Sequence, residues 1–410
     1  MEVSLPVVLA VLFAAAGAAQ AQTEVWLGVT KYRTERIPII LRPFTGDERL
    51  AETLNAVVSR DLSISGFFDM IPPHGADSVR ARATVDAFID AGEGVLQGSI
   101  HQAPGGERIA SSLQDLGASG PRDGAHRFSD DVIYHLTGER GISRTRIAFV
   151  RSDGRNSEIC VVDWDGSNLR KVISDGTVNL TPEWSPEGGI LLYTSYAEGD
   201  PDIFWREVER GTGGPVIRSP GMTSAPAWSP DGKRIALMMT RDGDSEIYVM
   251  KRDGTGLGRL THHRGIDTSP AWAPNGRQIL FVSDRSGGPQ VYRMNDDGSD
   301  VRRLTFGGDY NASPKWSPRG DRIAYASREE GGFQIRVLDL VDQESYLLTA
   351  QSGNNEDPEW SPDGRHLVFT SSRTGKRRLY VMQADGSGVR LLVPGEGEDY
   401  SPSWSPRPRF

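Results

Sequence analysis

The sequence predicts an α/β N-terminal domain followed by an all-β six-bladed β-propeller with four strands per blade. A Pro-x-Trp motif recurs six times: Trp228 minus Trp184 is 44, and every later pair of these tryptophans gives the same difference. A fixed period of this length indicates a repeat architecture. Apolar columns keep the same period and give four short strands per unit, as in a propeller blade. The residues that precede the six motifs are Thr181, Ala225, Ser269, Ser313, Asp357 and Ser401.

Prolines and turn residues place the strands within each blade. Proline removes a hydrogen-bond donor and is tolerated on edge strands. We therefore expect the Trp strand to be innermost, with its free edge lining a central channel. Ser229-Pro230-Asp231-Gly232 suits a type I turn after this strand. Asp-Gly pairs such as Asp253-Gly254 mark a hairpin between the third and fourth strands, and two units depart there, with Glu209-Arg210 and Val341-Asp342.

The two ends of the repeat region complete each other. The last unit ends six residues after Trp404, and the first begins at Ile147 without a Trp strand. Residues 147–410 number 264, which is six times 44. The C-terminal Trp strand should therefore supply the innermost strand of the first blade, built from residues 147 to about 175. Such a closure removes an exposed sheet edge.

Residues 34–140 form a non-repetitive region in which strand and helix patterns alternate, which is typical of a small α/β domain. Leu54, Val58 and Leu62 recur at helical spacing. The segment 102–122 is Gly-rich and supports no assignment. The expected elements are a strand at 37–41, a helix at 47–62, a strand at 67–71, a helix through Ala83, Ala87 and Phe88, a strand at 95–100 and a helix from about 124 to 136.

The first 33 residues lie outside both domains. Residues 1–21 read as an export signal, because an apolar run from Val7 to Ala19 precedes the cleavage pattern Ala19-Gln20-Ala21. The run is too short to span a bilayer. Residues 22–33 are strand-like. They are either an edge strand of the next domain or a detachable segment that pairs with a partner's sheet.

Composition excludes some classes of partner. The formal net charge is −9, whereas nucleic acids and anionic membranes recruit basic patches. We therefore expect neither nucleic-acid binding nor direct membrane insertion. The single cysteine, Cys160, forms no internal disulfide, and its apolar surroundings predict burial.

Loops between the fourth strand of one blade and the Trp strand of the next should emerge on one face, around the channel. They vary between units, and variable loops on a rigid scaffold are where binding usually occurs. They contribute adaptable side chains such as Met222 and Tyr310 and acidic ones such as Asp267 and Asp399. The loops are residues 175–179, 220–224, 262–268, 306–311, 351–356 and 395–400.

Patterns for catalysis or metal binding are weak. His262 and His263 are neighbours in one loop and lack a third ligand. The segment 242–246 matches only the opening of a calcium loop, and no Gly-x-Ser-x-Gly motif is present. We therefore expect no enzymatic activity, cofactor or metal. The alternative is an exported propeller enzyme, a lyase or hydrolase, with its site at the channel mouth.

The six repeats and the preceding domain together resemble the TolB family, the periplasmic propeller proteins of the Tol–Pal system. The resemblance covers nearly the whole chain after residue 21. Two places depart from the family: residues 102–124 are shorter and less strand-like, and Met222 stands where relatives carry a polar residue or histidine. The matching stretches outside the repeats are Arg42-Pro43-Phe44, residues 61–68 and, at the domain junction, residues 125–138 and 144–150.

The resemblance implies a non-enzymatic periplasmic scaffold, monomeric by itself. It implies binding to the outer-membrane lipoprotein Pal through the propeller and to TolA through the mature N-terminus, and it makes the detachable role of residues 22–33 the expected one. The implied role is to maintain outer-membrane integrity and to support outer-membrane invagination during cell division. The implied Pal-binding residues are Met222, Thr223, Ala225, Asp267, Thr268, Tyr310, Asn311, Glu356, Asp357, Asp399 and Tyr400. The implied TolA-binding residues are Gln22, Thr23, Glu24, Val25, Trp26, Leu27, Gly28 and Val29.

Overall fold

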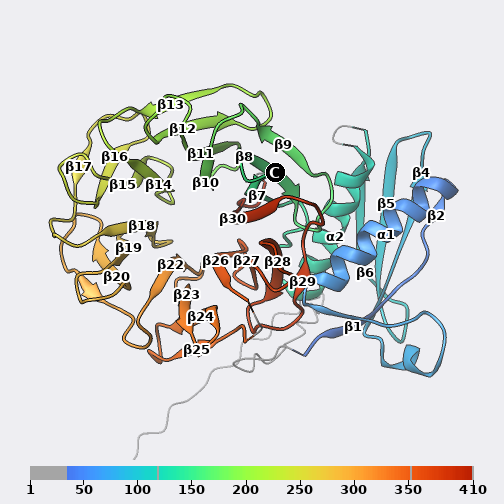
Figure 1. Ribbon diagram of the computed structural model, residues 1–410. Coiled ribbons are helices and arrows are strands. Elements are labelled where there is room, and N and C mark those ends of the chain that lie inside the picture. Colours follow the sequence, from blue (N-terminus) through green and yellow to red (C-terminus); the bar gives the residue numbers. More distant parts are fainter. Residues whose placement is uncertain (1–34, 118–119, 351–352, 409–410) are drawn as a thin grey trace, which may run out of the picture. The chain divides into compact units, whose positions relative to one another are not determined.

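The computed structural model describes residues 35–117, 120–350 and 353–408. The expected signal (1–21) and the strand-like segment 22–33 lie outside these described residues. Residues 36–410 form one compact unit, which holds a mixed α/β domain and a propeller (Figure 1).

A mixed sheet forms one layer of the N-terminal domain. Its strand order is β3-β1-β4-β5-β6, and β2 also pairs with β4. The pairs of β1 with β3 and with β4 are parallel, whereas β4, β5 and β6 pair antiparallel. The strands are β1 (Ile37–Leu41), β2 (Thr45–Gly46), β3 (Phe68–Met70), β4 (Ala83–Asp90), β5 (Val95–Gln102) and β6 (Arg108–Asp115), with a short 3-10 helix, η1 (Ala76–Arg80), before β4.

Two helices cover one face of this sheet. Helix α1 (Glu48–Ile64) begins at Asp47, whose carboxylate accepts a hydrogen bond from the Leu50 N–H at 2.9 Å. Helix α2 (Pro121–Thr137) ends at Gly138 in the left-handed conformation (φ 74°). Phe128 of α2 packs so closely on Gly98 of β5 that a Cβ there would lie 2.1 Å from its ring.

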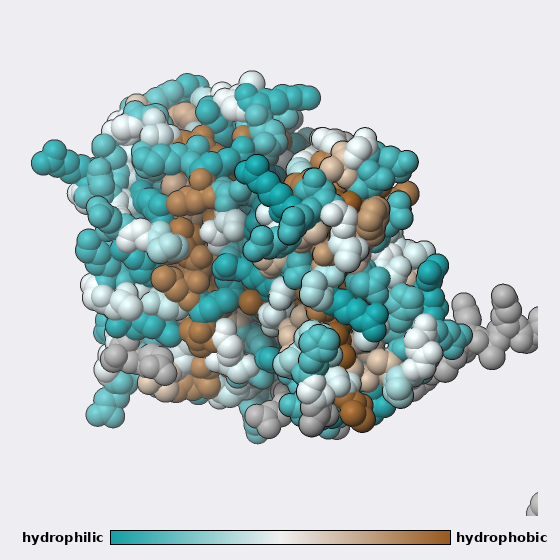
Figure 2. Space-filling view, turned by 90° about the vertical axis from the view of Figure 1, so that its right-hand side faces the viewer, coloured by the Kyte–Doolittle hydropathy of each residue, from teal (hydrophilic) through white to brown (hydrophobic). Residues whose placement is uncertain are grey.

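The other face of the sheet is open. Phe88 and Leu113 are exposed there, on either side of Gln97 in one cross-strand row. Figure 2 looks at the side of the molecule on which β4 and β5 lie in Figure 1, and it shows apolar residues in a band among hydrophilic ones.

Two expectations for this domain were wrong. The helix through Ala83, Ala87 and Phe88 is strand β4, in which alternate residues are buried. The eight-residue pairing with β5 overrides the helix propensity of alanine. The unassigned segment contains β6, a largely exposed edge strand in which exposed and partly buried residues alternate from Ile109 onward.

The propeller consists of six four-stranded sheets, as predicted, and the Trp strands line its centre in Figure 1. Blade by blade, the strands are β30 (Glu398–Trp404), β7 (Arg146–Ser152), β8 (Ser157–Asp163) and β9 (Arg170–Ile173); β10 (Asn179–Trp184), β11 (Ile190–Ser195), β12 (Asp202–Glu207) and β13 (Gly213–Ile217); β14 (Thr223–Trp228), β15 (Arg234–Met239), β16 (Glu246–Lys251) and β17 (Gly258–Arg259); β18 (Asp267–Trp272), β19 (Gln278–Ser283), β20 (Gln290–Asn295) and β21 (Arg302–Arg303); β22 (Asn311–Trp316), β23 (Arg322–Glu329), β24 (Gly332–Asp339) and β25 (Ser345–Leu347); β26 (Asn355–Trp360), β27 (His366–Ser371), β28 (Arg378–Gln383) and β29 (Arg390–Leu391).

The ring closes as the sequence predicts. C-terminal strand β30 pairs antiparallel with β7, the first strand of the repeat region, with Trp404 opposite Ile147. The backbone N–H of Ser405 extends this pairing by donating to the Arg146 carbonyl at 2.8 Å. The two ends of the repeat region, far apart in sequence, are therefore joined within one sheet, and β7 is not left as an edge strand.

Each Trp strand is an edge strand with a bulge at its proline. The residue before the proline has a positive φ in all six blades, between 46° and 53°. Pairing with the second strand shifts register there, for example between Leu180 and Glu183. Because the bulge interrupts the ladder where proline has no N–H to donate, the motif fits the strand.

Candidate partner-binding face and channel

The loop face of the propeller, called the mouth here, is the end at which the Trp strands begin. The first residue of β10, β14, β18 and β26 lies opposite the last residue of the second strand of its blade, as Asp267 lies opposite Ser283, and Asn311 of β22 lies opposite Ser327 near the end of β23. The loops that lead into the Trp strands and the loops between the second and third strands of the blades therefore emerge at the mouth. The side chains at this repeat position are fully buried in all six blades: Asn179, Thr223, Asp267, Asn311, Asn355 and Asp399.

Four of the implied Pal-binding residues are thus buried inside the protein: Thr223, Asp267, Asn311 and Asp399. Asp399 accepts two hydrogen bonds from Arg151, at 2.7 and 2.8 Å, and these bonds raise the pKa of Arg151. The guanidinium of Arg285 donates to Asp267 at 2.6 Å. Burial nevertheless raises the pKa of Asp267. The two aspartates hold their loops in place through these arginines, and none of the four side chains is exposed at the surface.

Other implied residues do reach the surface. Met222 is 41% exposed. The ring of Tyr310 meets Phe333 edge-on, with centroids 5.2 Å apart, and the guanidinium of Arg377 lies 4.0 Å from the centre of the Tyr400 ring. These contacts fix aromatic rings at the mouth without covering them completely. The remaining implied residues, Ala225, Thr268, Glu356 and Asp357, are partly exposed.

Sequence reasoning missed the two most exposed apolar side chains of these loops. Ile266 is 57% exposed and Phe306 is 76% exposed. They lie in neighbouring loops that lead into β18 and β22. A large apolar residue inside an otherwise polar loop was the available signal. Together with Met222 they give three consecutive loops an exposed apolar side chain each.

A charged cluster inside the channel was also missed. The residue between proline and tryptophan of the motif is Lys315 in β22, Glu183 in β10 and Glu359 in β26. The Lys315 ammonium lies 2.6 Å from Glu359 Oε2 and 3.2 Å from Glu183 Oε2. Burial alone would lower the pKa of Lys315, but the two carboxylates raise it overall.

The residues needed for the enzyme alternative do not converge. His262 and His263 are exposed, and Nδ1 of His263 accepts a hydrogen bond from the Gly265 N–H at 2.8 Å. In the part of the chain that the structure describes, no three His, Cys, Asp or Glu side chains gather where they could hold a metal ion. Among the same residues, no helix is both long and apolar enough to cross a membrane.

The α/β domain contacts the face opposite the mouth. Trp164, between β8 and β9, donates its indole N–H to Asp61 of α1 at 3.2 Å. Asp165, next to it, pairs with Arg122 of α2. His366, at the start of β27, contacts the Ile64 carbonyl at 3.0 Å. These connections lie at the end of the blades where the Trp strands finish, so the α/β domain leaves the mouth uncovered.

Comparison with protein families decides the assignment. Residues 133–408 match the model of the TolB beta propeller domain, and residues 25–119 match the model of the TolB amino-terminal domain. The chain belongs to the TolB family. The expectation from the sequence is confirmed at this level, and the chain is a propeller protein of the Tol–Pal type.

Individual relatives agree with this TolB assignment. The Tol-Pal system protein TolB of Nitrosomonas europaea is 35% identical over 189 residues, which is 42% of this chain and 44% of that protein. The one from Dechloromonas aromatica is 34% identical over 240 residues, covering 54% and 56%. The chain thus matches about half the length of these curated relatives. The crystal structure of TolB from Acinetobacter baumannii superimposes with a TM-score of 0.82 at 28% identity, covering 93% of this chain and 99% of that one.

Proposed function

We propose that this TolB-family chain is a non-enzymatic periplasmic scaffold of the Tol–Pal system. In this proposal Pal binds at the mouth of the propeller and TolA binds the segment 22–33. The protein thereby supports outer-membrane integrity and invagination of the outer membrane during division. The observation that carries the proposal is the match of both domains to the TolB family models.

The form of the mouth supports a protein partner. Met222, Ile266 and Phe306 expose apolar surface from three consecutive loops, and protein interfaces centre on such residues. The loops around them are anchored by buried pairs such as Arg285 with Asp267. A partner therefore meets a surface that is already in place, which reduces the entropy lost on binding.

A calorimetric titration with soluble Pal from the same organism tests the first half of the proposal. The variant Ile266→Asp with Phe306→Ala changes exposed side chains only, so the fold should be retained, and we expect binding at least tenfold weaker. Val341→Ala, on the hairpin between β24 and β25, is the matched control because Val341 is exposed but lies at the opposite end of its blade. If well-folded protein does not bind Pal, the scaffold proposal is wrong.

The second half is tested with the periplasmic domain of TolA. A chain that starts at residue 34 should lose TolA binding and retain Pal binding. The substitution Trp26→Ala should also weaken TolA binding, because tryptophan is enriched among the residues that contribute most to interface affinity. Unchanged TolA binding by the shortened chain would place that partner elsewhere.

A further inference from the structure

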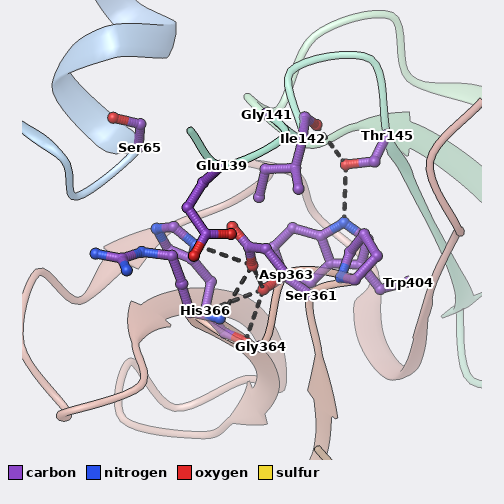
Figure 3. Close-up of polar contacts among 12 residues, drawn as sticks. Ser65, Glu139, Gly141, Ile142, Thr145, Ser361, Asp363, Gly364, His366 and Trp404 are labelled. Carbon is purple, nitrogen blue, oxygen red and sulfur yellow. Dashed lines mark hydrogen bonds and ion pairs between the residues drawn. The ribbon is translucent and has the colours of Figure 1, made fainter. Parts of the chain in front are cut away.

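His366 joins the propeller to the α/β domain. Its side chain is 3% exposed, and its Nε2 lies 3.0 Å from the carbonyl oxygen of Ile64, the last residue of α1. Because a carbonyl oxygen can only accept, Nε2 carries a hydrogen and donates it. Figure 3 shows His366 with Asp363, Ser361 and Gly364 of the β26–β27 hairpin.

The second ring nitrogen of His366, Nδ1, has no acceptor within hydrogen-bond distance among the described residues that would stabilise another proton. Nδ1 is 4.0 Å from Asp363 Oδ1, and that oxygen already accepts from the Ser361 hydroxyl at 2.5 Å and from the Arg365 N–H at 3.0 Å. Within the described residues Nδ1 meets no hydrogen-bond partner. The indole of Trp164 covers the ring edge-on, with centroids 6.0 Å apart. The site therefore fits a neutral imidazole.

Charged groups from every element around His366 decide how it responds to acid. Burial lowers the pKa of His366, and Arg390 and Arg365 lower it further, against the effect of Asp363 and the hydrogen bond to Ile64. The groups that act on His366 directly are Asp363 and Arg365 on its own hairpin and Arg390 on β29. Arg390 in turn interacts with Arg60 and Asp61 on α1 and with Asp165 between β8 and β9. Arg365 interacts with Asp363, Arg319 and Glu139.

We propose that His366 makes the attachment of the α/β domain to the propeller sensitive to acid, because its imidazole must stay neutral while it is enclosed by the end of α1. When the domains separate, the ring becomes exposed and regains an ordinary pKa of about 6.5. The attachment is then fully stable above that pH and weakens as pH falls, because the separated form binds the extra proton. Below the pKa of the separated form, each further unit of pH lowers the equilibrium constant for attachment by about tenfold. This effect ends at the lowered pKa of the attached form.

Other buried groups at this junction titrate in the opposite direction. Burial alone would lower the pKa of His126, but its hydrogen bond with Asp61 at 2.7 Å raises it overall. Burial raises the pKa of Asp130 to about 6. Both groups take up protons more readily in the folded molecule, so mild acid favours the compact form through them. Acid-induced weakening is therefore specific to His366, and a His366 variant separates the two effects.

Hydrogen exchange of the full chain tests this inference. Opening at the junction is followed by mass spectrometry of peptides that contain the end of α1 and the β26–β27 hairpin, after correction for the intrinsic pH dependence of exchange. From pH 6.5 to 5.5 we expect His366 to lower the protection of these peptides by up to about fivefold relative to His366→Gln, and protection of a β15–β16 peptide to change little. In His366→Gln, which keeps a neutral N–H donor for Ile64, that fall should disappear.

A control and an independent measurement keep the test decisive. His262→Gln removes an exposed loop histidine and should leave the pH response of the wild type intact. Equal pH responses in wild type and His366→Gln would overturn the inference. If the variant does not fold, NMR titration of the wild-type histidines decides: a pKa for His366 well below 6.5 supports the inference, and a pKa at or above 6.5 overturns it. The inference does not depend on the identity of any partner.

Discussion

Lys315 and Glu183 form an ion pair across the channel, with Nζ 3.2 Å from Oε2. They are 132 residues apart, which is three periods of 44, so they lie on opposite blades of the six-bladed ring. Glu359, on the neighbouring blade, holds the same ammonium at 2.6 Å. One lysine therefore connects three blades at the centre of the propeller, where a repeat architecture otherwise has contacts between neighbours only.

Removing this lysine should destabilise the propeller. Lys315→Met keeps most of the apolar stem but removes the ammonium and leaves two carboxylates facing each other. Because 27% of the Lys315 side chain is exposed to the channel, water screens part of the effect, and we expect a loss of about 1–3 kcal/mol in unfolding free energy by urea denaturation. Lys171→Met, which breaks an exposed pair with Glu158, is the control and should cost clearly less, because water screens an exposed pair. Equal losses would mean that the cross-channel pair contributes no more than an exposed surface pair.

Glu359 should make stability depend on pH near neutrality. Burial raises the pKa of Glu359 to about 7, against the lowering effect of Lys315. A carboxyl with a raised folded-state pKa holds its proton longer in the folded protein than in the unfolded chain. Wild-type stability should therefore fall as pH rises from about 4.5 to about 7, by on the order of 2 kcal/mol relative to Glu359→Gln. Urea denaturation of the wild type and Glu359→Gln at pH 5 and pH 7.5 measures this difference in unfolding free energy. The prediction is wrong if the unfolding free energies of the two proteins change equally between the two pH values.

Asp399 should be important for ring closure. It lies on β30 and pairs with Arg151 of β7 through two hydrogen bonds, and its side chain is fully buried. Asp399→Asn removes the charge and should cost about 2 kcal/mol, because Arg151, whose side chain is 18% exposed, loses its fully buried counter-ion. Glu198→Gln, which breaks the exposed pair with Arg218, should cost clearly less, because water screens an exposed pair. If Asp399→Asn costs no more unfolding free energy than Glu198→Gln, the pair of Asp399 and Arg151 is not needed for closure.

The repeat made most of the fold predictable. A period of 44 and prolines at fixed positions are local signals, and they were enough to predict six blades and closure by β30. Strand β4 was not predictable in this way, because Ala83 and Ala87 favour a helix locally and become a strand only by pairing with β5.

The chemistry of the mouth was harder to predict than its position. The loops were correctly placed on one face, but whether Asp267 or Asp399 reaches solvent depends on arginines that the sequence pattern does not pair with them. The partner of Asp399 is 248 residues away in the sequence. The cross-channel pair of Lys315 and Glu183 was missed for the same reason.

The tryptophans of the motif allow a matched test of one hydrogen bond at the closure. The indole N–H of Trp404 donates to the Thr145 hydroxyl at 2.9 Å (Figure 3), whereas that of Trp228 meets no acceptor among the described residues. Both side chains are buried at the same repeat position. Replacing either by phenylalanine removes similar apolar contact, so Trp404→Phe should cost about 1 kcal/mol more than Trp228→Phe. Thermal or urea unfolding of the two variants measures the difference, and Thr145→Val should remove it. If the two tryptophan variants are equally stable, the N–H of Trp404 adds nothing to closure, and apolar packing alone holds β30 in the ring.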